Sequence, residues 1–262
     1  MATSAVKFAR EGFHSITPYL IVPGAAEFID FAKASFGATE LFRVKRPESD
    51  AVMHAEIKIN DSIVELADAT PQFAPRPASI HLYVPDTDGA YARALEAGAT
   101  SIYEPIDQEY GDREAGVKDA FGNVWYIATH KTAQHIPEGL RTVTPYLQVQ
   151  GAAGMVDFLK RAFAAEQVER HESPEGTIVH AKLKIGDSIV EMSEAHGPFP
   201  AMPFALHLYV PDTDAVYSRA LEAGATSIQP PADQPYGDRS AGVKDAFGFT
   251  WFIATHLKDV HF

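Results

Sequence analysis

Apolar and polar residues recur with two different periods along the chain, and these periods predict its first elements. Thr17–Val22 alternates with a period of two, which predicts a short strand. From Gly24 to Ser35 the apolar residues recur at helical spacing, so a helix is predicted there. Three further strands are predicted at Thr39–Val44, Ala51–Ile59 and Ser62–Ala67.

The same order of elements then begins again. Ile80–Val84 predicts a strand, and Asp86 is placed to cap a helix that runs to Ala97, with Gly98 just beyond its end. Strands are predicted at Thr100–Glu104, Ala115–Lys118 and Asn123–Thr129, with a loop at Gly111–Arg113. The pattern is therefore a βαβββ unit that occurs twice.

The second half of the chain closely repeats the first. Of the 52 residues from Ser79 to His130, 39 are identical to their counterparts from Ala205 to His256. A period this long indicates two whole domains rather than a solenoid. We expect domain 1 over residues 1–130, a linker over 131–140, and domain 2 over 141–262, which gives four βαβββ units in total.

Charge and cysteine content limit the classes of function. The net charge of −13 argues against nucleic acid or a membrane as the partner, because either favours a basic face. The absence of cysteine excludes disulfides, thiolate nucleophiles and zinc–thiolate sites. No apolar run approaches a membrane span, and the first ten residues lack the apolar stretch of a secretory signal, so a cytoplasmic location is expected.

Several short phrases of the sequence carry a family resemblance. They are Thr17–Leu20, Phe36–Ala38, His54–Glu56, Gly111–Arg113 and Val117–Trp125. In this order they resemble the vicinal oxygen chelate superfamily of glyoxalase I, bleomycin-resistance proteins and extradiol dioxygenases, and in particular its PhnB-like or glyoxalase-like branch. The resemblance covers both repeats and implies an α+β fold of two tandem domains, whose curved sheets form clefts. It implies no single reaction, because that fold hosts many.

In the metal-dependent members of that superfamily, four strand positions together hold one divalent ion. The resemblance places these positions at Thr17, Glu65, His81 and Tyr126, and in the second repeat at Thr144, Glu191, His207 and Phe252. Threonine is a poor metal ligand and phenylalanine is none, so half of the set is missing. No metal ligand is therefore assigned, and nickel, zinc, magnesium or iron are the ions that a retained site would take.

Two side chains are the main candidates for the chemistry. Glu65 lies between apolar neighbours on a predicted central strand, where a carboxylate needs a partner or a ligand. His81 shares a strand face with Tyr83, opposite three aliphatic residues, so both should line the cleft. The alternatives are a buried glutamate satisfied by the backbone and a histidine with a purely structural hydrogen bond.

Other candidates have two interpretations each. Tyr126 corresponds to Phe252, so its hydroxyl is either a donor kept in one copy or incidental to an aromatic wall. Arg113 and Arg239 could bind a carboxylate or phosphate, but Gly-Asp-Arg is equally typical of a turn with a solvated ion pair. The remaining ligand-binding candidates are Thr17, Tyr19, Glu56, Tyr83, Thr144, Glu191, His207 and Phe252.

The two repeats differ at one charged pair. A two-residue turn at 60–61 makes Glu56 face Glu65 across the hairpin, whereas the counterparts are Lys182 and Glu191. Facing carboxylates destabilise a sheet unless they share a proton or recruit a cation. A three-residue turn would remove this pairing.

These features predict a glyoxalase-like protein that acts on or binds a small oxygenated molecule. In a lyase or isomerase reaction Glu65 would be the base, His81 the acid or orienting group, and Tyr126 a further catalytic residue. The alternative is a non-catalytic protein of the bleomycin-resistance type that binds a drug or antibiotic. The cleft could combine Glu65 with the half-unit of His81 or with that of His207, and the sequence leaves this choice open.

We expect the two repeats to pair as an intrachain pseudo-dimer, with a homodimer of the whole chain as a further state. Near-identical halves favour packing about a two-fold axis. Small-angle X-ray scattering should therefore show one compact particle. An extended, two-lobed particle with a flexible segment at 131–140 would contradict this prediction.

Overall fold

The computed structural model describes residues 8–132 and 134–260. Within these residues there are four helices and sixteen strands, and the strands belong to two eight-stranded sheets. The chain divides into two compact units, one of Tyr19–Tyr146 and one of Met1–Pro18 together with Leu147–Phe262. The predicted α+β class and the tandem βαβββ order are confirmed.

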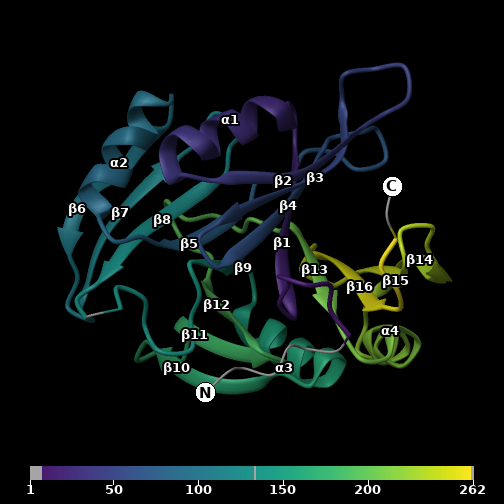
Figure 1. Ribbon diagram of the computed structural model, residues 1–262. Coiled ribbons are helices and arrows are strands. Elements are labelled where there is room, and N and C mark those ends of the chain that lie inside the picture. Colours follow the sequence, from purple (N-terminus) through teal and green to yellow (C-terminus); the bar gives the residue numbers. More distant parts are fainter. Residues whose placement is uncertain (1–7, 133, 261–262) are drawn as a thin grey trace. The chain divides into compact units, whose positions relative to one another are not determined.

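The unit of residues 19–146 contains two successive βαβββ repeats, and its helices α1 and α2 lie side by side (Figure 1). Each predicted strand and helix forms here, with small shifts at the ends. The elements are β1 (Ile16–Val22, whose first residues belong to the other unit), α1 (Ala25–Phe36), β2 (Thr39–Lys45), β3 (Val52–Ile59), β4 (Ser62–Asp68), β5 (Ser79–Tyr83), α2 (Thr87–Glu96), β6 (Thr100–Asp107), β7 (Asp112–Lys118), β8 (Val124–His130) and the first part of β9 (Val143–Val149).

The strands of this unit fall into two sheets. In one sheet β2, β3, β4 and β1 are neighbours in that order, and β4 is parallel to β1. In the other sheet β6, β7, β8, β5 and β9 are neighbours in that order, and β8 is parallel to β5. The other neighbouring pairs are antiparallel. The consecutive strands β4 and β5 therefore belong to different sheets, which determines which side chains can share a face.

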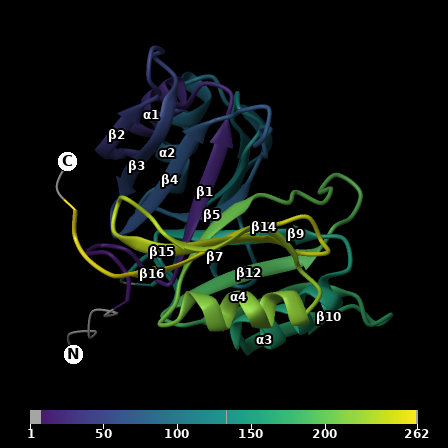
Figure 2. The same ribbon diagram turned by 90° about the vertical axis from the view of Figure 1, so that its right-hand side faces the viewer.

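The second unit repeats these elements, and its helices α3 and α4 also lie side by side (Figure 2). Its elements are α3 (Ala152–Phe163), β10 (Glu166–Glu172), β11 (Ile178–Ile185), β12 (Ser188–Glu194), β13 (Ala205–Tyr209), α4 (Thr213–Glu222), β14 (Thr226–Asp233), β15 (Asp238–Lys244) and β16 (Thr250–His256). Strands β13 and β16 are parallel, as β5 and β8 are. None of the described helices is long and apolar enough to cross a membrane.

The turn between β3 and β4 has the predicted two residues. Asn60 adopts a φ of 52°, and its counterpart Gly186 a φ of 61°. Both values lie in the left-handed region, which asparagine and glycine tolerate best. Ile59 then pairs with Ser62, and the rest of the hairpin follows in register. The sequence prediction of this turn is confirmed.

The predicted loop at Gly111–Arg113 is wrong in part. Asp112 and Arg113 already belong to β7, because they pair with His130 and Thr129 of β8. Only Gly111, with a φ of 100°, lies in the preceding turn. The α2 cap is as predicted, since the Asp86 side chain accepts a hydrogen bond from the Gly89 amide.

A buried aspartate organises the turn before β8, and a second one organises the corresponding turn before β16. Asp119 accepts hydrogen bonds from the amides of Phe121 and Asn123, from the Asn123 side chain and from the indole of Trp125. Trp125 is fully buried, and its ring packs against Phe36 with centroids 4.8 Å apart. Trp125 and its counterpart Trp251, also fully buried, are therefore core residues.

The counterpart Asp245 accepts hydrogen bonds from the Trp251 indole and from the amides of Phe247 and Phe249. Phe249 replaces Asn123, so this carboxylate lacks the side-chain amide donor that Asp119 has. Burial raises the pKa of both carboxyl groups, and for Asp245 it raises the pKa to about 6.

We predict that Asp245 makes the protein less stable as the pH rises from about 4 to about 6. Its pKa is higher in the folded than in the unfolded state, so the folded state binds more protons in this range and stability falls as they leave. Urea unfolding measures the free energy of unfolding of the parent and of Asp245→Asn. The difference between the two should change by on the order of 3 kcal/mol over this pH range. A pH-independent difference would contradict this assignment.

Candidate functional site

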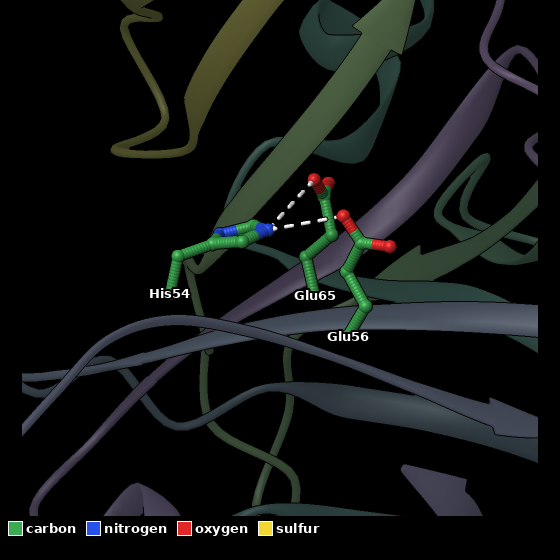
Figure 3. A group of neighbouring side chains, drawn as sticks. All are labelled: His54, Glu56 and Glu65. Carbon is green, nitrogen blue, oxygen red and sulfur yellow. Dashed lines mark hydrogen bonds and ion pairs between the residues drawn. The ribbon is translucent and has the colours of Figure 1, made fainter. Parts of the chain in front are cut away.

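The β3–β4 hairpin brings three ligand-type side chains to one face of its sheet. His54 and Glu56 are two residues apart on β3, so they point to the same side. Glu65 on β4 is the direct cross-strand partner of Glu56. Ala55, between His54 and Glu56, and Ile57, after Glu56, are fully buried on the opposite face. We refer to His54, Glu56 and Glu65 as the β3–β4 site; their side chains point toward one another (Figure 3).

The β3–β4 site combines two buried carboxylates with a partly exposed imidazole. Glu56 is 4% exposed and Glu65 is 2% exposed, whereas the His54 side chain is 24% exposed. The His54 Nε2 atom lies 3.3 Å from Glu56 Oε1 and 3.9 Å from Glu65 Oε1. Two ionised carboxylates this close would repel each other by on the order of 3 kcal/mol at an effective dielectric constant of ~20. The imidazole, when protonated, would offset that repulsion.

Aromatic side chains flank the imidazole. The Tyr19 hydroxyl lies 3.3 Å from His54 Nδ1, and Tyr19 is the register partner of Glu65 on the neighbouring β1. The ring of Phe42, on β2, lies with its centroid 6.3 Å from that of His54. The hydroxyl fixes the orientation of the imidazole, and the exposed Phe42 offers an apolar surface beside it.

The structure does not bring Glu65 and His81 together on one sheet. Glu65 lies on β4, and His81 lies on β5, in the other sheet. Thr17, the first of the four family positions, is buried and belongs to the other compact unit. The β3–β4 site therefore contains one of those positions, Glu65, with two residues of β3 beside it.

His81 instead lies beside a carboxylate that two tyrosines hold. Its Nε2 atom is 3.5 Å from Glu114 Oε2. The hydroxyls of Tyr103 and Tyr110 donate to Glu114, over 2.5 Å and 3.0 Å. Burial and the Glu114 carboxylate raise the pKa of both tyrosines, so their hydroxyls remain protonated donors. We refer to His81, Tyr103, Tyr110, Glu114 and Tyr126 as the tyrosine cluster.

Tyr126 and Thr144 occupy the strands on either side of His81. Both are its register partners, Tyr126 on β8 and Thr144 on β9. The ring of Tyr126 lies 5.2 Å from that of Tyr146, and burial raises the pKa of its phenol. Tyr126 and Tyr146 thus form an aromatic surface beside His81. This arrangement is compatible with Tyr126 as a hydroxyl donor and with Tyr126 as part of an aromatic wall.

Tyr83 belongs to a structural network. Its ring packs against that of His81 with centroids 4.3 Å apart, and its hydroxyl donates to the buried Asp112. The His130 imidazole binds the other oxygen of Asp112. The second unit repeats the network with Tyr209, His256 and Asp238.

Arg113 and Arg239 lie in exposed ion pairs. Arg113 binds Asp88 and Asp107, and Arg239 binds Asp214 and Asp233 in the same way. These contacts match the interpretation of a solvated ion pair. Such pairs at the surface contribute little stability.

The second unit carries an altered copy of the β3–β4 site. His180 Nε2 lies 3.4 Å from Glu191 Oε1, but Lys182 replaces Glu56 and is the register partner of Glu191. The Lys182 ammonium lies 3.0 Å from Glu169, which replaces Phe42, and lowers the pKa of that carboxyl. The altered copy therefore has a lysine ammonium, that of Lys182, where the β3–β4 site has the carboxylate of Glu56.

The counterpart of the tyrosine cluster is likewise reduced. His207 keeps its place and its ring packs on Tyr209, with centroids 4.4 Å apart. Its register partner is Phe252, and Ser240 and Gln229 stand where the first unit has Glu114 and Tyr103. The two units therefore differ in the polar groups they offer a ligand.

Four residues of these clusters were not among the predicted site residues, namely His54, Tyr103, Tyr110 and Glu114. The sequence could have predicted His54, because residues two apart on a strand point to the same face, and Glu56 was already a candidate. Glu114 and Tyr103 lie on β7 and β6, whose register contains two irregularities that the local pattern does not reveal. Their proximity to His81 follows from the sheet order.

Comparison with known proteins gives a consistent family. Residues 12–127 and 139–253 each match the sequence model of the Glyoxalase/Bleomycin resistance protein/Dioxygenase superfamily. An uncharacterized protein of Mycobacterium bovis is 35% identical over 130 residues, which are 45% of this chain and 86% of that protein. An uncharacterized protein of Mycobacterium tuberculosis shows the same identity over 45% of this chain and 76% of its own length.

Solved structures show the same fold. Glyoxalase I from Zea mays matches with a TM-score of 0.68 at 15% identity, over 92% of each chain. A candidate dioxygenase from Bacillus subtilis matches with a TM-score of 0.59 at 14% identity, over 95% of this chain and 86% of that one. At such identities the likeness concerns the fold alone.

We predict that Glu114→Ala destabilises the protein by about 2 kcal/mol, because the hydroxyls of Tyr103 and Tyr110 lose their acceptor. Urea unfolding measures this change. The matched control Ser240→Ala should cost less, about 0.5–1 kcal/mol, because it removes one 3.3 Å contact to the exposed Tyr236. Equal losses for the two variants would show that the tyrosine cluster has no special structural role.

Proposed function

The chain belongs to the Glyoxalase/Bleomycin resistance protein/Dioxygenase superfamily, and on this basis we propose that it acts on a small oxygenated molecule at the β3–β4 site. The observation that carries the proposal is the pair of buried carboxylates, Glu56 and Glu65, beside the partly exposed His54. A folded protein buries two facing carboxylates at a cost, and functional sites are where such costs are commonly found.

The reaction class that this site serves best is proton transfer at a carbon next to a carbonyl group. In an α-hydroxy carbonyl compound Glu65 would take the proton from the hydroxyl-bearing carbon and return it to the former carbonyl carbon. The hydroxyl proton would pass to the former carbonyl oxygen, which completes an isomerisation without any other reactant. The more exposed His54 would meet the substrate oxygen first. Tyr19 keeps the imidazole in place through its contact at Nδ1.

His81 enters this proposal as a separate group. It lies on the other sheet from Glu65, so its role would be to bind or orient a ligand within the tyrosine cluster. The second unit has Ser240 and Phe252 at the places of Glu114 and Tyr126, so it has neither the carboxylate nor the phenol hydroxyl there. We therefore propose that Glu65 and His81 matter more for activity or binding than Glu191 and His207 do.

A second candidate function is non-catalytic binding of a drug-like molecule at the tyrosine cluster. The aromatic rings of Tyr126 and Tyr146, and the carboxylate of Glu114, favour a planar molecule with a positive charge. The net charge of −13 would attract such a ligand from solution. Under this alternative Tyr126→Ala weakens binding and Glu65→Gln leaves it unchanged.

Glu65→Gln should slow proton exchange in a bound oxo compound by about 100-fold or more, because it removes the base. A thermal-shift screen of small hydroxy- and oxo-acids supplies the ligand, since a bound ligand raises the melting temperature. Nuclear magnetic resonance in D2O then measures how fast the carbon-bound proton of that ligand is replaced by deuterium.

The matched control is Glu191→Gln, which should retain most of the exchange. Binding without any exchange in the parent protein would favour the non-catalytic alternative. Exchange that survives Glu65→Gln would contradict the assignment of Glu65 as the base.

A further inference from the structure

The donor atoms of the β3–β4 site are arranged as a ligand set. One nitrogen of His54 and one oxygen each of Glu56 and Glu65 all lie within 4.8 Å of one another (Figure 3). The site draws its donors from two neighbouring strands of one sheet, β3 and β4, within a single compact unit. The strand backbones hold all three side chains on one face.

The separations fit one bound ion. Zinc and related ions bind nitrogen and oxygen over about 2.0–2.2 Å, so two donors around one ion lie roughly 3–4.4 Å apart. The His54 Nε2 atom lies 3.3 Å and 3.9 Å from the two carboxylate oxygens, within this range. The third separation, between the two carboxylate oxygens, is at most 4.8 Å, so a rotation of one carboxylate would close the set around an ion.

The chemistry of the donors selects a class of ion. An imidazole nitrogen with two carboxylates suits first-row divalent ions such as Zn²⁺, Mn²⁺, Fe²⁺ and Ni²⁺, whereas Ca²⁺ and Mg²⁺ prefer oxygen alone. The Tyr19 oxygen can accept a hydrogen bond from His54 Nδ1, which turns the Nε2 lone pair toward the carboxylates. An outer partner of this kind is usual for histidine ligands.

The set differs from the four positions that the family resemblance implies. Of those positions it uses Glu65 alone, and it replaces the poor ligands Thr17 and Tyr126 with two residues of β3. The four family positions by themselves predicted no metal ligand. His54 lies outside them, and Glu56 entered the prediction solely as the cross-strand partner of Glu65.

The internal repeat provides a comparison. At the place of Glu56 the second unit has Lys182, beside the same histidine–glutamate pair of His180 and Glu191. A lysine ammonium is a covalently attached cation at this point of the sheet. The first unit has a carboxylate there instead, and it gains the negative charge and donor that a bound cation needs.

We propose that His54, Glu56 and Glu65 bind one first-row divalent metal ion per chain, and that Lys182 takes the place of such an ion in the second unit. The inference deepens the proposed function, because it concerns the same side chains, but it does not depend on turnover. An ion bound there would polarise a substrate oxygen as a Lewis acid. Each carboxylate would give one oxygen to the ion, so Glu65 would accept the proton on its second oxygen.

Isothermal titration with Zn²⁺ tests the site directly on the full chain after treatment with a chelator. One saturable site per chain is expected. Glu56→Lys copies the second unit into the first and should weaken zinc binding by about 100-fold or more, because it replaces a ligand by a cation. Glu65→Gln, which preserves side-chain volume, should act in the same direction. His180→Ala is the matched control and should leave the affinity unchanged.

The reciprocal exchange is the sharper test. Lys182→Glu combined with Glu169→Phe gives the second unit the ligand set of the first, since His180 and Glu191 already stand in register. The zinc content of this double variant should rise from one to two ions per chain. Thermal unfolding with and without zinc checks that each variant is folded.

Two results would overturn the proposal: the absence of a saturable zinc site in the folded parent, or a stoichiometry that neither Glu56→Lys nor Glu65→Gln reduces. The second result would assign the zinc to adventitious sites on exposed histidines. Zinc binding that depends on Glu56, in a protein without deuterium exchange, would support the metal site while contradicting the proposed function. Exchange that depends on Glu65, in a protein that binds no zinc, would support the proposed function and contradict the metal site.

Discussion

The register of the β3–β4 hairpin is the constraint on which the site depends. Because side chains alternate along a strand, a shift of one residue would move Glu65 to the helix-covered face and bring Val64 into its place. The two-residue turn prevents this, since Asn60 accepts the left-handed conformation that so short a connection requires. The pairing of Glu56 with Glu65 is therefore a consequence of backbone geometry.

Local features were predictable from the sequence, and long-range ones were not. The turn and the capped helix α2 each follow from a few neighbouring residues, and both were predicted. The separation of Glu65 from His81 was not, because it depends on which sheet β5 joins after the chain leaves β4. No periodicity within either strand carries that information. The same limit applies to Glu114, which reaches His81 only through the order of β7, β8 and β5.

The two units agree where side chains support the backbone and differ where polar groups face a ligand. The aspartate that receives a tryptophan indole occurs in both, as does the aspartate that binds a tyrosine and a histidine. The differences include Glu56 against Lys182, Glu114 against Ser240, and Tyr126 against Phe252. A shared framework of this kind lets one copy change its chemistry without a change of fold.

The negative charge of each buried carboxylate near these sites is stabilised by different neighbouring groups. Glu114 receives two neutral tyrosine hydroxyls, whose protonated state burial itself maintains. Glu191 has a histidine beside it and, as its register partner, a lysine whose ammonium binds Glu169. Glu65 has a histidine beside it and a second carboxylate as its register partner. The cation that offsets the negative charge of the two carboxylates therefore depends on what binds in the site. Of the three arrangements, the one at Glu65 can therefore respond to a ligand, and this is the physical reason to locate the chemistry there.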